Sequence, residues 1–294
     1  MAIEIAMPTT PNFMRSTFRL HRAVGQTISP FTGTQKTQEY DYVGWSADVT
    51  LPPMRRSVAV NWQSWLTRLK GSSNFFQFAD PDALTNTGTY DTAYLEAVPR
   101  VTNTSTTLTF SAANSTIVDD GTAFANVLVG DYIFITGAND TINNGTHKVS
   151  AKSGDNTVTV TSTLADETND SACTIKQNVK GATGLALKAS TSGAAGSIAV
   201  GDYLGVLTAA SATSTPTQLL LVTEVSTETA VSSGDGKNLI SVGTEPKLRA
   251  DITSGHFVKF TSPKGIFRLT DNIVEWGGDR NSNYNMSFTV TEVI

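Results

Sequence analysis

The fold class is decided at the end of the chain, where residues 284–294 read YNMSFTVTEVI. Apolar side chains at Tyr284, Met286, Phe288 and Val290 alternate with polar ones, and a period of two is typical of a β-strand that buries one face. A strand at the end of a polypeptide can still be tied into a central sheet. The segment therefore predicts a long strand that belongs to a β-sheet framework.

The composition of the whole chain favours the same class. Charged residues make up 16% of the 294 residues, and about one residue in seven is threonine. The charged fraction is well below the roughly 25% of an ordinary domain. Threonine is β-branched and favours strands, whereas Asn, Ser and Gly favour turns. We therefore expect a mainly β protein.

Several classes of protein do not fit this composition. The single cysteine, Cys173, cannot form an intramolecular disulfide, and with three histidines it is too little for a thiolate–imidazole zinc cluster. No apolar run approaches the roughly 20 residues of a membrane helix, and residues 1–14 lack the features of a secretory signal. The net charge of −5 argues against a dedicated nucleic-acid binder. We expect no membrane insertion, no specific nucleic-acid binding, and assembly in a reducing cytoplasm.

Two residue types divide the chain. No arginine lies between Arg100 and Arg249, and all four tryptophans lie outside this stretch. This change in composition near residues 100 and 249 marks a domain border. It predicts a discontinuous β-sandwich framework domain, made of residues 1–99 and 249–294, that carries a β-rich insertion. A linear arrangement of two or three domains is the alternative.

The framework is expected to begin with two strands, residues 16–24 and 39–51, joined by a turn at residues 29–34. The apolar phase of the second strand shifts across Gly44, which predicts a β-bulge there because an extra residue exchanges the two faces. Shorter framework strands are expected at residues 74–78, 257–260, 265–269 and 273–276.

One helix is expected, at about residues 54–70. Pro52 and Pro53 end the preceding strand and suit the first helical turn, and Gly71 suits the C-terminal cap. Apolar residues at helical spacing form a stripe that we interpret as core packing against the sheet, with ligand stacking by the tryptophans as the alternative. The stripe consists of Val58, Trp62, Trp65, Leu66 and Leu69.

The insertion contains an internal repeat. In each half a strand-like segment is followed by Gly-Asp-Tyr and a further strand, and the two copies of this turn motif are Gly130, Asp131, Tyr132 and Gly201, Asp202, Tyr203. In such a motif Gly-Asp forms a turn and the tyrosine begins a strand. Two related small β-barrel or β-roll modules are therefore predicted, at residues 100–178 and 179–248.

The sequence carries no recognisable catalytic motif. It has neither a Gly-x-Ser-x-Gly nucleophile elbow nor a Gly-x-x-x-x-Gly-Lys phosphate loop. The three histidines, His21, His147 and His256, are dispersed, and Cys173 lies in a strand-like segment that favours a core role. We predict no enzymatic activity, no cofactor and no metal site.

Two other classes stay open at this stage. An all-β hydrolase would need two facing carboxylates, and no spacing singles out a pair among Glu39, Asp48, Asp279 and Glu292. A carbohydrate-binding protein would present aromatic side chains from the insertion. That insertion has few of them, namely Phe124, Tyr132, Phe134 and Tyr203.

Several segments resemble one family of phage proteins. They are residues 74–81 (NFFQFADP), 179–185 (VKGATGL), 200–203 (VGDY), 242–249 (VGTEPKLR) and 262–269 (SPKGIFRL). Together with a strand-rich N-terminus and a Trp-containing helix that ends in Leu-x-Gly, they resemble the distal tail proteins of siphophage-like tailed viruses. The resemblance covers residues 13–98 and 179–294. It skips residues 100–178, which we interpret as an extra copy of the downstream module.

The resemblance implies a non-enzymatic structural protein of the tail tip, or baseplate, of a bacteriophage virion. Such proteins form a ring, usually hexameric, that joins the tail-tube protein to the hub and fibre proteins used in host attachment. Their framework is a β-sandwich with a long hairpin and one helix, and peripheral β-domains often decorate the ring. A tail protein that binds host-surface glycan, or a tail-tube or neck protein, is the alternative.

Overall fold

The computed structural model describes residues 2–89, 94–168, 172–188, 197–207, 215–226 and 238–293. The chain forms two compact units. The framework unit comprises Met1–Leu84 and Lys264–Ile294, and the inserted unit comprises Thr85–Pro263. Strands predominate in the described residues, which contain one α-helix and a closed barrel, so the predicted mainly β class with a small inserted barrel is confirmed.

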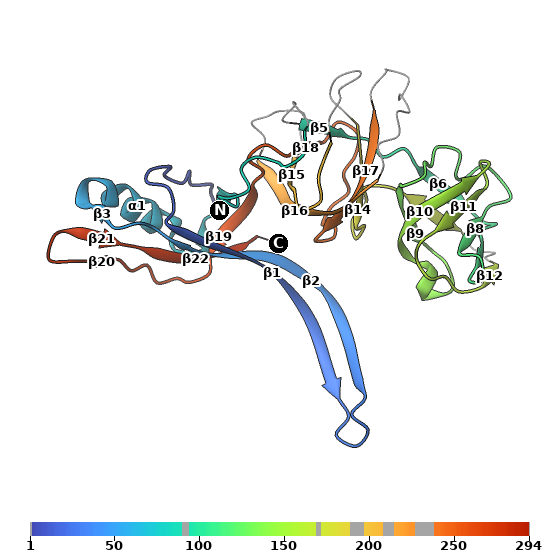
Figure 1. Ribbon diagram of the computed structural model, residues 1–294, viewed down its shortest axis with the longest axis horizontal. Helices are drawn as coiled ribbons and strands as arrows, with labels where there is room; N and C mark the ends of the chain where they lie inside the picture. Colours follow the sequence, from blue (N-terminus) through green and yellow to red (C-terminus); the bar gives the residue numbers. More distant parts are fainter. Residues whose placement is uncertain are drawn as a thin grey trace. The chain divides into compact units, whose positions relative to one another are not determined.

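The main sheet of the framework unit has five antiparallel strands (Figure 1). In spatial order they are β1 (Arg15–Ile28), β2 (Gln35–Thr50), β22 (Ser287–Glu292), β19 (Gly265–Leu269) and β4 (Phe76–Phe78). The C-terminal strand thus lies in the middle of the sheet. A second, three-stranded sheet consists of β20 (Gly277–Gly278), β21 (Asn283–Asn285) and β3 (Met54–Arg55).

The helix α1 (Arg56–Leu69) is attached to the main sheet by aromatic contacts. The ring of Trp65 lies 4.8 Å from that of Phe76 and 5.4 Å from that of Phe288, both edge to face. In the predicted stripe the two tryptophans and two leucines are buried, whereas Val58 is half-buried and Ala59 is buried in its place. In the described part of the chain, no helix is long and apolar enough to span a membrane.

The β-bulge expected across Gly44 is not there, because Gly44 pairs in register with His21. The register instead shifts farther out, between the pairs Arg22–Val43 and Val24–Glu39. The apolar phase changes at Gly44 because β2 passes there from an exposed ribbon into the buried sheet. A change of burial along one strand therefore produced the pattern that had suggested an extra residue.

The inserted unit contains a closed barrel of six strands. Around the barrel they are β14 (Gly184–Lys188), β17 (Leu239–Glu245), β16 (Pro216–Val225), β15 (Tyr203–Leu207), β18 (Phe257–Lys259) and β5 (Tyr94–Ala97). Its core is mainly aliphatic, with Leu185, Leu204, Leu220 and Val242 among the buried residues.

Two of the barrel strands lie in residues that we assigned to the framework, although only residues 257–260 were expected to form a strand. Strand β5 precedes the predicted border at residue 100, and β18 follows the predicted border at residue 248, yet they pair with each other and with β14 and β15. The chain needs both strands to close the barrel, a non-local requirement that arginine and tryptophan positions do not reveal. The expected strand at residues 273–276 is also wrong, because this segment joins no ladder and Ile273 is 81% exposed.

The remaining part of the inserted unit, which we call the satellite module, is an eight-stranded sheet with its own core. In spatial order its strands are β12 (Glu167–Thr168), β7 (Thr109–Ser111), β8 (Thr116–Val118), β11 (Thr157–Val160), β10 (Gly145–Ser153), β9 (Tyr132–Thr136), β13 (Cys173–Lys176) and β6 (Thr102–Ser105). Cys173 is fully buried in that core.

Replacing Trp65 should destabilise the framework unit strongly. Trp65→Ala removes a buried ring that bridges the helix and two strands, and such truncations cost about 3–5 kcal/mol of unfolding free energy. Urea denaturation followed by circular dichroism measures this loss. The control is Trp276→Ala, which removes a tryptophan that is 44% exposed and should change the free energy by about 0.5 kcal/mol or less. Similar losses in both variants would contradict the central role of Trp65.

Candidate functional site

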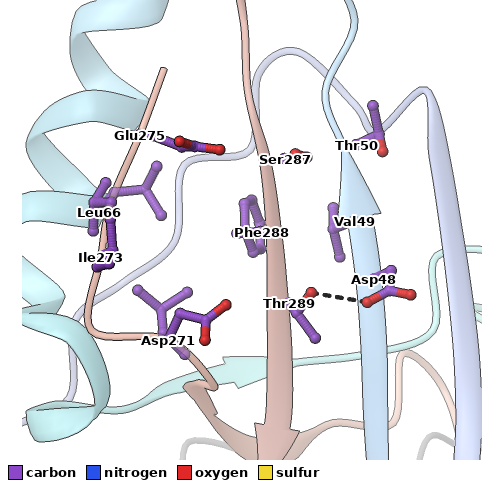
Figure 2. A pocket seen from close by; sticks show the side chains of 12 residues that line it. Asp48, Val49, Thr50, Leu66, Asp271, Ile273, Glu275, Ser287, Phe288 and Thr289 are labelled. Carbon is purple, nitrogen blue, oxygen red and sulfur yellow. Dashed lines mark hydrogen bonds between the residues drawn. The ribbon is translucent and has the colours of Figure 1, made fainter. Parts of the chain in front are cut away.

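A groove of the framework unit lies between β22 and the extended segment 270–276. It has a volume of about 550 Å³, within the range of ligand-binding pockets. Figure 2 shows Phe288 in the middle of the groove, with Leu66 of α1 and Ile273 on one side and Val49 of β2 on the other. Its apolar centre is therefore built from three elements that are distant in the sequence.

Carboxylates surround this apolar centre. Asp48 forms an ion pair with Arg19 at 2.5 Å and accepts a hydrogen bond from the Thr289 hydroxyl at 2.8 Å. These two hydrogen bonds hold the pKa of Asp48 below its usual value, so this group stays ionised near neutral pH. Asp271 and Glu275 are exposed, and no ion pair of either is found in the part of the chain that the structure describes. The groove thus has an apolar centre and a negatively charged rim.

One wall of the groove is an open strand edge. On the β2 side of β22, the carbonyl of Met286 accepts from Leu51, and on the β19 side the carbonyl of Thr289 accepts from Thr270. Alternate residues of an antiparallel strand bond to opposite neighbours, so the backbone of Ser287 faces the same side as that of Thr289. Strand β19 has ended by this point, so no described strand pairs with Ser287 there.

The carboxylates that we considered for hydrolysis do not form a catalytic pair. Glu39 lies 3.4 Å from Arg22, the buried Glu292 accepts the N–H of Trp45 at 3.4 Å, and Asp48 pairs with Arg19. Asp279 caps a turn by accepting the backbone N–H groups of Asn281 and Asn283, and the bonds from Asn283 are the main reason that its pKa is lowered. Within the described residues, no group of three His, Cys, Asp or Glu side chains could hold a metal ion.

A second feature of the framework unit is a projecting ribbon, which we call the arm (residues 23–42). Strand β2 pairs with β22 only from Ser46 to Thr50, whereas β1 and β2 continue to pair with each other out to Ile28 and Gln35. Figure 1 shows this hairpin extending beyond the rest of its sheet. The residue pattern predicted both strands but not this length, because the outer residues do not alternate between buried and exposed sides; a long hairpin was implied only by the family resemblance.

The arm carries exposed apolar side chains. Phe31 at its tip is 96% exposed, and Ile28 beside it is 60% exposed. Val24, Tyr40 and Tyr42 farther down are each about half exposed. A two-stranded ribbon is marginally stable by itself, and apolar groups at such a tip are usually covered in a complex.

The repeated turn motif is reproduced bond by bond in the two modules. The carboxylate of Asp131 accepts the N–H of Leu128 at 2.8 Å, and that of Asp202 accepts the N–H of Ala199 at 2.8 Å. In both copies the aspartate N–H also donates back to the carbonyl three residues earlier, at 3.1 and 3.2 Å. Both aspartates are buried.

The glycines of the motif have the same role in both copies. Gly130 and Gly201 have φ angles of +94° and +93°, a conformation that favours glycine. Their N–H groups donate to the carbonyls of Val149 and Val222, and the N–H groups of these two valines donate to the carbonyls of Asp131 and Asp202. The motif residues thus fix a turn that ties two strands together, and Tyr132 and Tyr203 begin the next strand.

The satellite module is docked on the barrel by Tyr132. Its ring lies on a notch made by Gly184 and Gly243, which are partners on adjacent barrel strands. Its hydroxyl donates to Glu224 at 2.6 Å, and Lys148 pairs with the same carboxylate at 2.7 Å. Burial and the contact with Glu224 raise the pKa of Tyr132, so the phenol remains a hydrogen-bond donor.

Asp131 adds a buried polar link to the same junction. Besides closing its own turn, its carboxylate accepts from the guanidinium of Arg100 and from the Ser241 hydroxyl of the barrel strand β17. Farther along, the N–H of Thr183 donates to Thr146 at 3.1 Å. Two modules that sequence reasoning predicted as separate repeats are therefore joined by specific contacts.

The four aromatic side chains that we considered for sugar binding, three in the satellite module and Tyr203 in the barrel, form no exposed platform. Phe124 is fully buried, Tyr132 is in the junction, and Phe134 and Tyr203 are half-buried. A polar groove of about 360 Å³ does lie beside residues 103–107. Its carboxylate, Asp119, is committed to four hydrogen bonds from Thr107, Ser105 and two backbone N–H groups.

Comparison with known proteins adds no identification. No protein-family model matches this chain, and no curated protein matches it in sequence. Inferences about its function therefore rest on the residues and the geometry described above.

Filling the glycine notch should uncouple the two modules. A Cβ at position 184 would lie 2.1 Å from Cγ of Tyr132, so Gly184→Ala must displace the ring. We expect a loss of about 1–3 kcal/mol of unfolding free energy for the inserted unit. Urea unfolding and limited proteolysis near residue 180 measure it.

The matched control for the notch is Gly277→Ala, because a Cβ there meets nothing within 4 Å. This variant should unfold like the unmodified protein. A Gly184→Ala protein of unchanged stability and unchanged proteolysis would show that Tyr132 does not hold the junction.

The stability of the satellite module should fall as the pH is lowered from about 7.5 to 5.5. His147 is buried, its ring nitrogens contact Ser162 and the carbonyl of Asn143, and burial lowers its pKa. Around pH 6.5, where an unfolded histidine titrates, the unfolded chain gains a proton that the folded chain does not accept, so unfolding becomes easier. The melting temperature measured at several pH values tests this.

Two variants isolate the contribution of His147. His147→Gln should reduce the change in melting temperature across this pH range, whereas His256→Gln, in the same unit, controls for the loss of a histidine as such. An unchanged pH dependence in His147→Gln would assign the effect to other groups.

Proposed function

We propose that this protein is a non-enzymatic structural subunit of a bacteriophage tail tip, and that it associates with copies of itself into a ring. The observation that carries the proposal is the arm. In the arm, β1 and β2 pair only with each other, beyond the point where β2 stops pairing with β22. The apolar side chains at its tip are exposed.

The energetics of the arm support self-association. From Phe31 to Tyr40 every side chain is exposed, so burial contributes little to the stability of this stretch. Covering Phe31 and Ile28 in a neighbour would stabilise both the ribbon and the assembly by roughly 25 cal/mol per Å² of apolar surface. An arm that reaches from one subunit to the next is a heterologous contact, and such contacts produce closed rings when the rotation between subunits closes.

The placement in a tail tip rests on the sequence resemblance. Distal tail proteins have a sandwich framework with a long hairpin and one helix, and the framework unit with its arm and α1 agrees with that description. The proposed partners are other copies of the chain, the tail-tube protein, and the hub and fibre proteins. The proposed location is the tail tip of the virion.

Removing the arm should abolish assembly without unfolding the protein. A variant in which residues 23–42 are replaced by Asn-Gly keeps the paired residues Arg22 and Val43 and closes the hairpin with a favoured two-residue turn. The unmodified protein is expected to form closed rings in native mass spectrometry and negative-stain images, and this variant is expected to stay monomeric. A circular dichroism melt checks that it is folded.

The control for the arm is a variant that removes exposed apolar side chains elsewhere, Val129→Ser with Ile142→Ser. It should assemble like the unmodified protein. If the unmodified protein is monomeric at all concentrations and has no affinity for tail-tube protein, the proposed function is wrong.

A further inference from the structure

We propose that the groove between β22 and segment 270–276 is the receptor for the arm tip of a second copy of this chain. The tip comprises residues 28–36. The inference rests on the self-association proposed above and names the two surfaces that meet.

The tip cannot occupy the groove of its own chain. Asp48 and Thr50 line the groove, and Gln35 at the tip is 13 residues along the same strand from Asp48. A strand rises about 3.3 Å per residue, so β2, which pairs with β1 on both sides of the register shift, separates the two sites by about 40 Å. An occupant from this sequence must therefore come from another copy.

The apolar surfaces of the two sites are complementary. Val49, Leu66 and Phe288 form the buried floor of the groove, and Ile273, which is 81% exposed, supplies apolar surface on its wall. The tip offers Phe31, the most exposed large apolar side chain of the described residues, and Ile28 beside it. A groove of about 550 Å³ is large enough to accept both side chains.

The charges are complementary too. From residue 28 to residue 36 the tip contains one charged side chain, Lys36, and no acidic one. The rim of the groove carries Asp271 and Glu275, while Asp48 is already neutralised by Arg19. The two rim carboxylates therefore suit a cationic tip, and they would repel an acidic one.

The walls of the groove also offer backbone partners. Ser287 presents its backbone groups on the side where β19 has ended. On the opposite wall, no backbone hydrogen bond of residues 271–276 is found within the described residues. An extended peptide entering here can pair with such an edge as an added strand, the mode known as β-augmentation.

The proposed contact also explains how one surface pair can build a closed assembly. Each chain has one tip and one groove, and the tip of one copy enters the groove of the next. Such a head-to-tail contact leaves no free tip or groove once a ring has closed.

Disulfide trapping tests the contact directly. Phe31→Cys combined with Ile273→Cys should give, on mild oxidation, a ladder of covalent oligomers in denaturing gels, because a disulfide requires Cα atoms within about 7 Å. Cys173 is fully buried and gives no background. The control pair is Phe31→Cys with Ile142→Cys, whose second site is exposed in the satellite module and should give no ladder.

A charge exchange provides the second measurement. Lys36→Glu should weaken self-association about two- to fivefold in sedimentation velocity, the size expected for a rim ion pair. Adding Glu275→Lys to the Lys36→Glu variant should restore self-association, whereas Glu275→Lys alone should weaken self-association.

The outcomes separate this inference from the proposed function. Rings that form without a 31–273 ladder and without charge rescue would overturn the groove as the receptor while leaving the ring intact. A protein that forms no oligomer would overturn both. A ladder that is specific to the 31–273 pair, together with charge rescue, supports both.

Discussion

The antiparallel ladder between β1 and β2 is the interaction on which the framework unit depends. At its inner end it places Ala47 and Val49 in the core and pairs β2 with the C-terminal strand. At its outer end the same two strands have only each other as partners and become the arm. Because β2 contributes to both the groove and the arm, the two sites lie at opposite ends of one strand.

The inner end of the ladder is held by aromatic packing. The rings of Phe18 and Phe78 are stacked at 5.4 Å, and Phe78 meets Phe267 of the next strand edge to face at 5.5 Å. On α1, Trp62 and Trp65 lie edge to face at 5.5 Å, and the indole of Trp62 donates to the carbonyl of Thr10. The rigid aromatic layer gives the arm a fixed base, which an isolated ribbon would lack.

Local patterns in the sequence predicted the elements that local forces determine. The alternation in residues 284–294 predicted one long strand, but the structure divides this stretch into β21 of the three-stranded sheet and β22 of the main sheet, so only its second part was placed correctly. The spacing of Trp62, Trp65, Leu66 and Leu69 predicted the helix. The Gly-Asp turns were found because their hydrogen bonds lie within a few residues of each other. These are the features that depend least on the rest of the fold.

Non-local features could not be predicted in the same way. Barrel closure by β5 and β18 joins strands separated by more than 150 residues of sequence, and neither strand has a distinctive composition. The groove is likewise built from Val49, Leu66 and Phe288, which meet only after the sheet and helix have packed. The length of the arm did not follow from the residue pattern, since its exposed residues follow no burial pattern, and only the family resemblance implied a long hairpin.

The two copies of the turn motif show how one local structure serves different ends. In the barrel, the carboxylate of Asp202 also accepts from the N–H and hydroxyl of Thr87, so it fastens the segment that leads into β5. In the satellite module, the carboxylate of Asp131 accepts from Arg100 and from Ser241 of the barrel. A buried carboxylate needs donors in either place, and in one copy a donor comes from the neighbouring module. The same turn that closes one module therefore also joins the two.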